Sequence, residues 1–105
     1  SLVSFWQQRG MNTQGLSIYD GSGLSLKNTI TPRQQVFLLS YMKNHGKNYD
    51  VFYHSLAIAG RTGTLKNMFL GTAAENRIHA KSGTLDGVRT YVDYLTTTSG
   101  KEIAF

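Results

Sequence analysis

Two alternating runs on either side of an Asp-Gly pair constrain the fold of this chain most strongly. The run over 77–81 alternates between polar and apolar residues, and a longer alternating run follows the pair. The residues on one face of that second run are Val88, Thr90, Val92 and Tyr94. A period of two is typical of a β-strand with one buried face. Asp-Gly favours a two-residue hairpin turn. The sequence therefore predicts an antiparallel hairpin that turns at Leu85-Asp86-Gly87.

The first half of the chain has the spacing of helices. Apolar residues within 2–9 predict a short amphipathic helix that ends at Gly10. The stretch 31–34 predicts the start of a longer helix, because its threonine can cap, its proline fits the first helical position and its glutamine completes a capping box. We expect that helix to be buried, since apolar residues occupy most of its circumference, and to end at Gly46.

Shorter elements are expected between and after these segments. The sequence predicts a short strand over 16–19, a helix over 48–57 and a short helix near 64–69. A third strand begins at residue 102 and stops in mid-pattern at Phe105. We therefore expect the 105 residues to be part of one domain that continues beyond them.

Composition excludes several classes of function. Eleven Lys and Arg against six Asp and Glu give a net charge of +5, which would suit an anionic partner. The basic residues are scattered singly, however, so we expect no nucleic-acid binding. The absence of cysteine excludes disulfides and thiolate metal sites. His45, His54 and His79 lack metal-ligand spacing, so we expect no metal and no other cofactor. No apolar run approaches the ~20 residues of a membrane span.

Two segments carry groups that suit the binding of a carboxylate and the transfer of a proton. Within 81–84, a lysine and a hydroxyl can hold a carboxylate, and the glycine leaves room for another backbone. Upstream, the glycine-rich loop 20–28 carries the hydroxyl of Ser25 and the carboxamide of Asn28. Alone, a DGSG stretch is most often a turn. A single K-S-G-T at the end of a strand is usually coincidence.

Taken together and in order, these motifs resemble the C-terminal part of serine D-alanyl-D-alanine carboxypeptidase/endopeptidases, the class C low-molecular-mass penicillin-binding proteins. The segments that carry the resemblance are DGSGLS at 20–25, Asn28, Thr31-Pro32, residues 56–60 with Gly63-Thr64-Leu65, and HAKSGTLDGV at 79–88. The resemblance implies an α+β fold, part of a β-lactamase/transpeptidase-like domain in which helices flank an antiparallel sheet. Residues 1–105 would be the C-terminal part of a single such domain, truncated at both ends.

The family lines one cleft with a Ser-x-x-Lys nucleophile, a Ser-x-Asn loop and a Lys-Thr-Gly strand. The resemblance implies that Lys81 stabilises the substrate carboxylate and holds the proton network beside it. Ser82 keeps the hydroxyl of the usual threonine. Gly83 would let a peptide lie alongside as an added strand. The backbone N–H of Thr84 would be one donor of the oxyanion hole.

On the loop, the resemblance implies that Ser25 relays a proton toward the leaving amine and that Asn28 hydrogen-bonds the substrate amide. These two residues are three positions apart, whereas the family pattern has two. The implied catalytic residues are thus Ser25, Asn28 and Lys81. The implied substrate-binding residues are Ser82, Gly83 and Thr84.

The nucleophile is the missing element. Ser40 and Lys43 match Ser-x-x-Lys as a string, but they lie between the other two motifs, and the family places the nucleophile upstream of both. Ser40 also falls late in the predicted helix, where the helix dipole opposes a developing anion. We therefore expect the attacking serine to lie outside these 105 residues.

The expected function is that of a fragment of a serine-type D-Ala-D-Ala carboxypeptidase/endopeptidase, which acts on peptidoglycan stem peptides through an acyl-enzyme. Its partners would be those peptides and β-lactams, in the bacterial cell envelope, and the fragment alone would be inactive. One alternative is a serine β-lactamase or esterase of the same fold, for which no deacylating carboxylate can be assigned. The other is a non-catalytic peptidoglycan-binding remnant. The acidic residues considered are Asp20, Asp50, Glu75, Asp86, Asp93 and Glu102.

Overall fold

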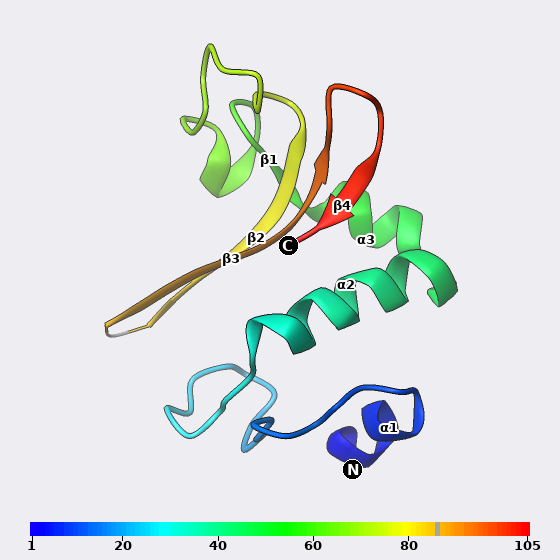
Figure 1. The fold of residues 1–105 in the computed structure, drawn as a ribbon. Helices are drawn as coiled ribbons and strands as arrows, with labels where there is room; N and C mark the ends of the chain where they lie inside the picture. Colours follow the sequence, from blue (N-terminus) through cyan, green and yellow to red (C-terminus); the bar gives the residue numbers. More distant parts are fainter. Residues whose placement is uncertain (86) are drawn as a thin grey trace.

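The computed structural model describes residues 1–85 and 87–105, and its centre is a four-stranded antiparallel sheet (Figure 1). The strands are β1 (Ala57–Ile58), β2 (Ile78–Leu85), β3 (Val88–Thr96) and β4 (Glu102–Ala104), in the spatial order β1-β2-β3-β4. The predicted hairpin is confirmed, because Leu85 pairs with Val88. Gly87 has a φ of 75°, which favours glycine in such a turn. Asp86, the other predicted turn residue, lies outside the described residues.

Four helical segments accompany the sheet: α1 (Leu2–Gln8), α2 (Pro32–His45), α3 (Tyr49–Ser55) and the 3-10 helix η1 (Gly63–Leu65). The predicted cap of α2 is confirmed. The backbone N–H of Gln34 donates to the Thr31 hydroxyl at 3.1 Å, and the Gln34 side chain accepts from the Thr31 N–H at 2.9 Å. Two donors at the helix start are thereby satisfied. Gly46 caps the end of α2, as predicted.

Three shorter predictions differ from the structure. The helix expected over 48–57 ends at Ser55, because Ala57 and Ile58 pair with β2 as strand β1. The helix expected near 64–69 is only the single turn η1. The strand expected over 16–19 is reduced to one bridge between Ser17 and Thr29. In the described part of the chain, no helix has the length and apolar character needed to cross a membrane.

The prediction that α2 is buried round most of its circumference is wrong. Leu39 is the one apolar residue of α2 that is fully buried, and the others are half-exposed. In Figure 1 the sheet lies along one side of α2 and α1 with its following loop lies along the other, and the rest of the helix circumference stays partly exposed. The hydroxyl of Tyr94 on β3 donates to the Leu39 carbonyl at 2.7 Å and fixes α2 against the sheet.

The core consists of two clusters on opposite faces of the sheet. Neighbouring strand residues point to opposite faces, so Tyr94 faces α2 and α3 while Leu95 faces the segment around η1. The buried residues of the first cluster are Leu39, Leu56 and Tyr94, and those of the second are Ala59, Leu65, Ile78 and Ala80. Helices therefore flank an antiparallel sheet, which confirms the predicted α+β class.

Candidate active site

The outer edge of β2 is open where the Lys-Ser-Gly-Thr motif lies. Strand β1 pairs only with His79 and Ala80, so among the described residues the edge over 81–85 has no strand partner. The carbonyl of Ile78 accepts from Ala59 on this outer side. Backbone groups of an antiparallel strand alternate between its two edges. Ser82 and Thr84 therefore turn their N–H and C=O groups toward the open edge.

The side chains of this edge form a small polar group. The ammonium of Lys81 is exposed and donates to the backbone carbonyl of Ser82. The Ser82 hydroxyl lies 3.2 Å from the hydroxyl of Thr64, in η1. A cation, two hydroxyls and an outward-facing N–H of Thr84 thus lie along one strand edge. Such a set can bind an anionic group and a peptide backbone together.

Gly83 is fitted closely against the neighbouring strand. It pairs with Thr90 on β3, and a Cβ added to Gly83 would lie 2.9 Å from the Thr90 hydroxyl oxygen. Any side chain at this position would have to displace Thr90. The glycine therefore has a structural reason inside the sheet, in addition to the room for a substrate that the sequence indicates.

The upstream loop is organised around a single pair of side chains. The Asn28 amide nitrogen donates to the carboxylate of Asp20 at 2.7 Å, and its carbonyl oxygen accepts from the N–H groups of Tyr19 at 2.7 Å and Asp20 at 3.3 Å. The same carboxylate accepts from the Ser25 N–H at 2.9 Å and from Gly23. These donors, Asn28 first, hold the pKa of Asp20 below its usual value.

The predicted site residues thus form two separate groups. In Figure 1 the loop over 20–28 lies on the same side of α2 as α1, which is the side away from the sheet. Among residues 1–85 and 87–105, no hydrogen bond or ion pair joins Ser25 or Asn28 to Lys81. The Ser25 hydroxyl accepts instead from the Lys27 N–H at 3.2 Å, within its own turn. The predicted catalytic roles of Ser25 and Asn28 stay predictions.

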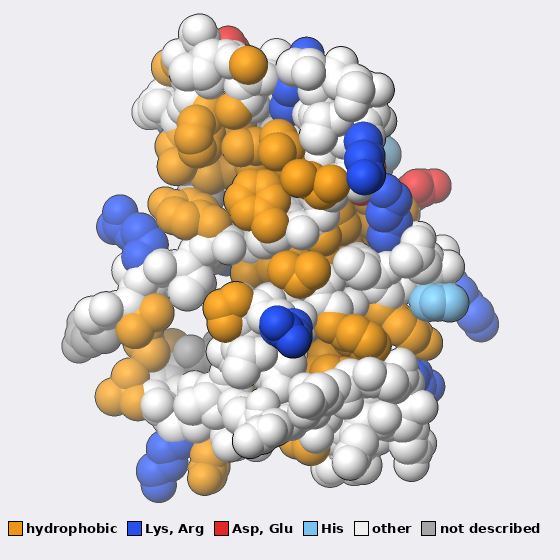
Figure 2. Space-filling model, viewed as in Figure 1, with side chains coloured by type: hydrophobic (Ala, Val, Ile, Leu, Met, Phe, Trp, Pro, Cys, Tyr) orange, Lys and Arg blue, Asp and Glu red, His pale blue; other side chains and the backbone are white. Residues whose placement is uncertain are grey.

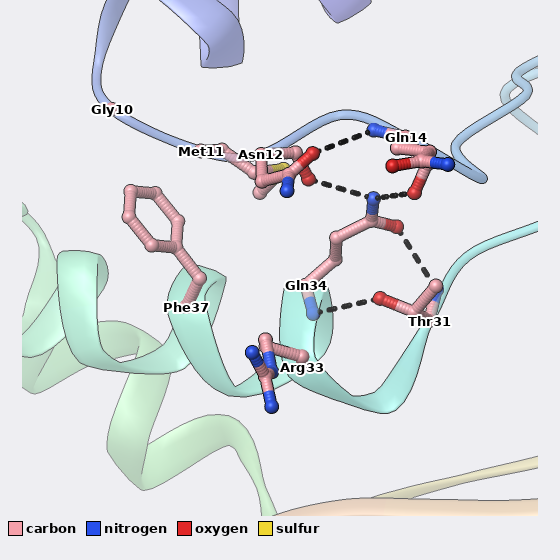
Figure 3. Close-up of a pocket in the computed structure, with 8 residues that line it drawn as sticks. All are labelled: Gly10, Met11, Asn12, Gln14, Thr31, Arg33, Gln34 and Phe37. Atoms are coloured by element: carbon pink, nitrogen blue, oxygen red, sulfur yellow. Dashed lines mark hydrogen bonds between the residues drawn. The ribbon is translucent and has the colours of Figure 1, made fainter.

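Gln34 holds in place the segment that leads from α1 to that loop. Its side chain is 3% exposed and donates to the carbonyls of Asn12 and Gln14, both at 2.9 Å (Figure 3). These contacts hold the segment after α1 against the start of α2, beside a cavity of about 430 Å³. Both polar atoms of the Gln34 side chain are already hydrogen-bonded to backbone groups, so they are not available to bind a ligand in this cavity.

The Ser40-x-x-Lys43 string is not arranged as a nucleophile and its base. The ammonium of Lys43 pairs with the carboxylate of Glu102 at 3.6 Å. Glu102 also accepts a 2.5 Å hydrogen bond from the hydroxyl of Tyr49. This group connects α2, α3 and β4, and the location of the attacking serine outside these residues stays a prediction.

Thr64 belongs to this site, although its sequence position predicts no role for it. It is within the Gly63-Thr64-Leu65 segment that supports the resemblance, but its contact with Ser82 spans 18 positions. No local pattern signals that contact. A hydroxyl in a glycine-bounded turn just after a short strand is the one available hint.

An antiparallel sheet between helices, with a lysine, hydroxyls and a glycine along an open edge, is characteristic of the transpeptidase-like domains of penicillin-binding proteins. Comparison with known proteins supports this class. The chain belongs to the D-Ala-D-Ala carboxypeptidase 3 (S13) family, whose sequence model matches residues 1–105. The structure resembles penicillin binding protein 4 (dacB) from Haemophilus influenzae, solved with a β-lactam, with a TM-score of 0.83 and 26% identity over 98% of this chain and 24% of that one.

Curated relatives point to the same family. The chain is 39% identical to a D-alanyl-D-alanine carboxypeptidase of Actinomadura over 91% of this chain and 18% of the relative. It is 29% identical to the D-alanyl-D-alanine carboxypeptidase DacB of Haemophilus influenzae over 100% of this chain and 22% of the relative. The chain therefore spans about a fifth of the length of these relatives.

Proposed function

We propose that the whole protein is a serine-type D-alanyl-D-alanine carboxypeptidase of the bacterial cell envelope. It would act on peptidoglycan stem peptides and be acylated by β-lactams. The present residues would supply the substrate-binding strand of its cleft. The observation that carries this proposal is the open edge of β2, which presents Lys81, Ser82 and the N–H of Thr84 together.

The edge offers a binding mode for a peptide that ends in a carboxylate. An extended peptide can pair with the N–H of Ser82 and with the N–H and C=O of Thr84 as an added strand. The ammonium of Lys81 and the hydroxyl of Ser82 would hold the terminal carboxylate. The N–H of Thr84 would stabilise the oxyanion when a serine from outside these residues attacks the penultimate carbonyl, a contact typically worth roughly 3–4 kcal/mol.

The acyl-transfer reaction would proceed in two steps. The serine Oγ forms a bond to the carbonyl carbon, its proton passes to the leaving nitrogen, and D-alanine is released. Water then attacks the ester and regenerates the serine. For Ser25 and Asn28 the contacts favour a role in shaping the loop, because the groups that the catalytic prediction needs are bonded to Asp20, Tyr19 and Lys27.

The test is the reaction of the whole protein with a fluorescent penicillin. Lys81→Ala should slow acylation at least tenfold, because the carboxylate of the antibiotic loses its cation. Lys47→Ala is the matched control, since Lys47 is an exposed lysine outside the β2 edge. Release of D-alanine from a D-Ala-D-Ala peptide should fall in parallel with acylation. An unchanged acylation rate in Lys81→Ala would remove this strand from the site.

A further inference from the structure

A second cavity lies on the sheet face opposite α2 and α3. It has a volume of about 240 Å³. Its inner wall is apolar and includes Leu65, Met68, Ile78 and Ala80. Figure 2 shows hydrophobic side chains gathered over the sheet and over the neighbouring segment that contains η1. The mouth of the cavity therefore lies on an apolar surface.

One charged side chain lines this cavity. Asp93, on β3, is 4% exposed, and its Oδ1 has no hydrogen-bond partner among the described residues. Its backbone is satisfied by Phe105, with hydrogen bonds of 2.9 and 3.0 Å in the two directions. Burial without a partner raises the pKa of Asp93 to about 6. A buried carboxylate in such a position is costly unless a cation or a donor meets it.

The rim of the cavity is also unusual for a free surface. Phe69, Tyr91 and Phe105 line it and remain 43%, 41% and 52% exposed. Phe69 has a φ of 62°, a backbone conformation that is rare for a bulky residue. Several exposed aromatic side chains around one opening mark a surface that another element covers.

The chemistry of the cavity defines its occupant. Apolar walls suit a methylene stem, and a carboxylate suits the charged group at its end. Lysine and arginine side chains combine these two features. The relatives and the solved structure described above contain about four to six times as much chain as the part matched here, so a large part of such a protein is available to pack on this face.

We propose that this face of the sheet, around Phe69, Tyr91 and Phe105, docks a segment of the same polypeptide from outside residues 1–105. That segment places a lysine or arginine side chain in the cavity, against the carboxylate of Asp93. The carboxylate of Asp93 lies on the sheet face opposite the Lys81 side chain, because Asp93 pairs with Ala80 and successive residues of a strand point to opposite faces. A tethered segment is favoured over a free ligand because its effective concentration is high.

Asp93→Asn in the whole protein tests this proposal by the sign of its effect. If a cation faces Asp93, the nearly isosteric amide loses the ion pair, and Tm at pH 7 falls by several degrees. The difference between wild type and variant should shrink in acid, as the pH falls through the pKa of the ion-paired carboxylate. Asp50→Asn removes the same charge from an exposed position and should leave Tm nearly unchanged.

Other occupants give different results, and each overturns the proposal. An empty cavity leaves the carboxylate unpaired, so Asp93→Asn would raise Tm at pH 7. An open cavity that accepts a free amine would show protection by millimolar n-butylamine in the wild type and none in Asp93→Asn. A second copy would make the Tm difference depend on protein concentration. A crystal structure of the whole protein should show a Lys or Arg nitrogen within about 4 Å of the carboxylate.

Discussion

The hydroxyls of Thr64 and Ser82 lie 3.2 Å apart and join η1 to the edge of β2. Thr64 follows β1, which pairs with β2 over only two residues. The Thr64 hydroxyl reaches β2 just beyond Ala80, the last residue of β2 that pairs with β1. The contact therefore fixes the position of the Ser82 hydroxyl on the open edge. A substrate carboxylate that binds there would meet a hydroxyl already held in place.

Thr64→Val should weaken the site without unfolding it. The substitution keeps the shape of the side chain and removes one neutral hydrogen bond, worth about 0.5–1.5 kcal/mol. We expect acylation of the whole protein by a fluorescent penicillin to slow about two- to tenfold. Ser99→Ala, which removes a hydroxyl from the β3–β4 turn, is the control. Equal rates for Thr64→Val and wild type would show that the contact does not serve the site.

Gly83→Ala should reveal two separate demands on this position. The new Cβ would lie 2.9 Å from the Thr90 oxygen, and we expect about 1 kcal/mol of destabilisation in urea unfolding. Adding Thr90→Ala removes the clash and should restore stability. If the substrate also approaches Gly83, the double variant should remain slow in acylation. A double variant with normal stability and normal acylation would restrict the role of Gly83 to the sheet.

Asn28→Ala should act on stability before chemistry. The side chain satisfies the N–H of Tyr19 and holds Asp20, so its loss leaves backbone donors of the loop without their partner. We expect a loss of about 1–3 kcal/mol of stability. KM and kcat for a D-Ala-D-Ala peptide should change little at a temperature where the variant is folded. A large fall in kcat with an unchanged Tm would instead support the predicted catalytic role of Asn28.

The 105-residue chain should lose stability as the pH rises through the titration of Asp93. The pKa is raised from 3.8 to about 6 in the folded state, so between these values the folded state binds more protons than the unfolded state. The contribution of Asp93 to the free energy of unfolding is then largest below about pH 4, falls between pH 4 and 6, and is lost above about pH 6. The total is on the order of 2–3 kcal/mol. Asp93→Asn should flatten the curve, as measured by urea unfolding at several pH values.

The 105-residue chain should form no stable adduct with a fluorescent penicillin. Ser40 lies within α2 and its potential partner Lys43 is paired with Glu102. Mass spectrometry of the chain after incubation with the penicillin checks this. A covalent adduct on Ser25, Ser40 or Ser82 would contradict the expectation that the nucleophile lies elsewhere.

Local features of the sequence determined much of the fold. The hairpin follows from alternation and a turn with glycine at Gly87, and the start of α2 follows from the Thr31–Gln34 capping box. Each depends on hydrogen bonds between residues close in the chain, so the pattern is visible without the fold. The motif around Lys81 also indicated the family correctly.

Tertiary structure alone decided the rest. Residues 57 and 58 have no intrinsic reason to leave a helix, and they form β1 because β2 offers them a partner. The contact of Thr64 with Ser82, the separation of the 20–28 loop from Lys81, and the burial of Asp93 all depend on the packing of segments distant in sequence. Side-chain contacts between such segments arise from the path of the whole backbone, and no periodicity or short motif records them.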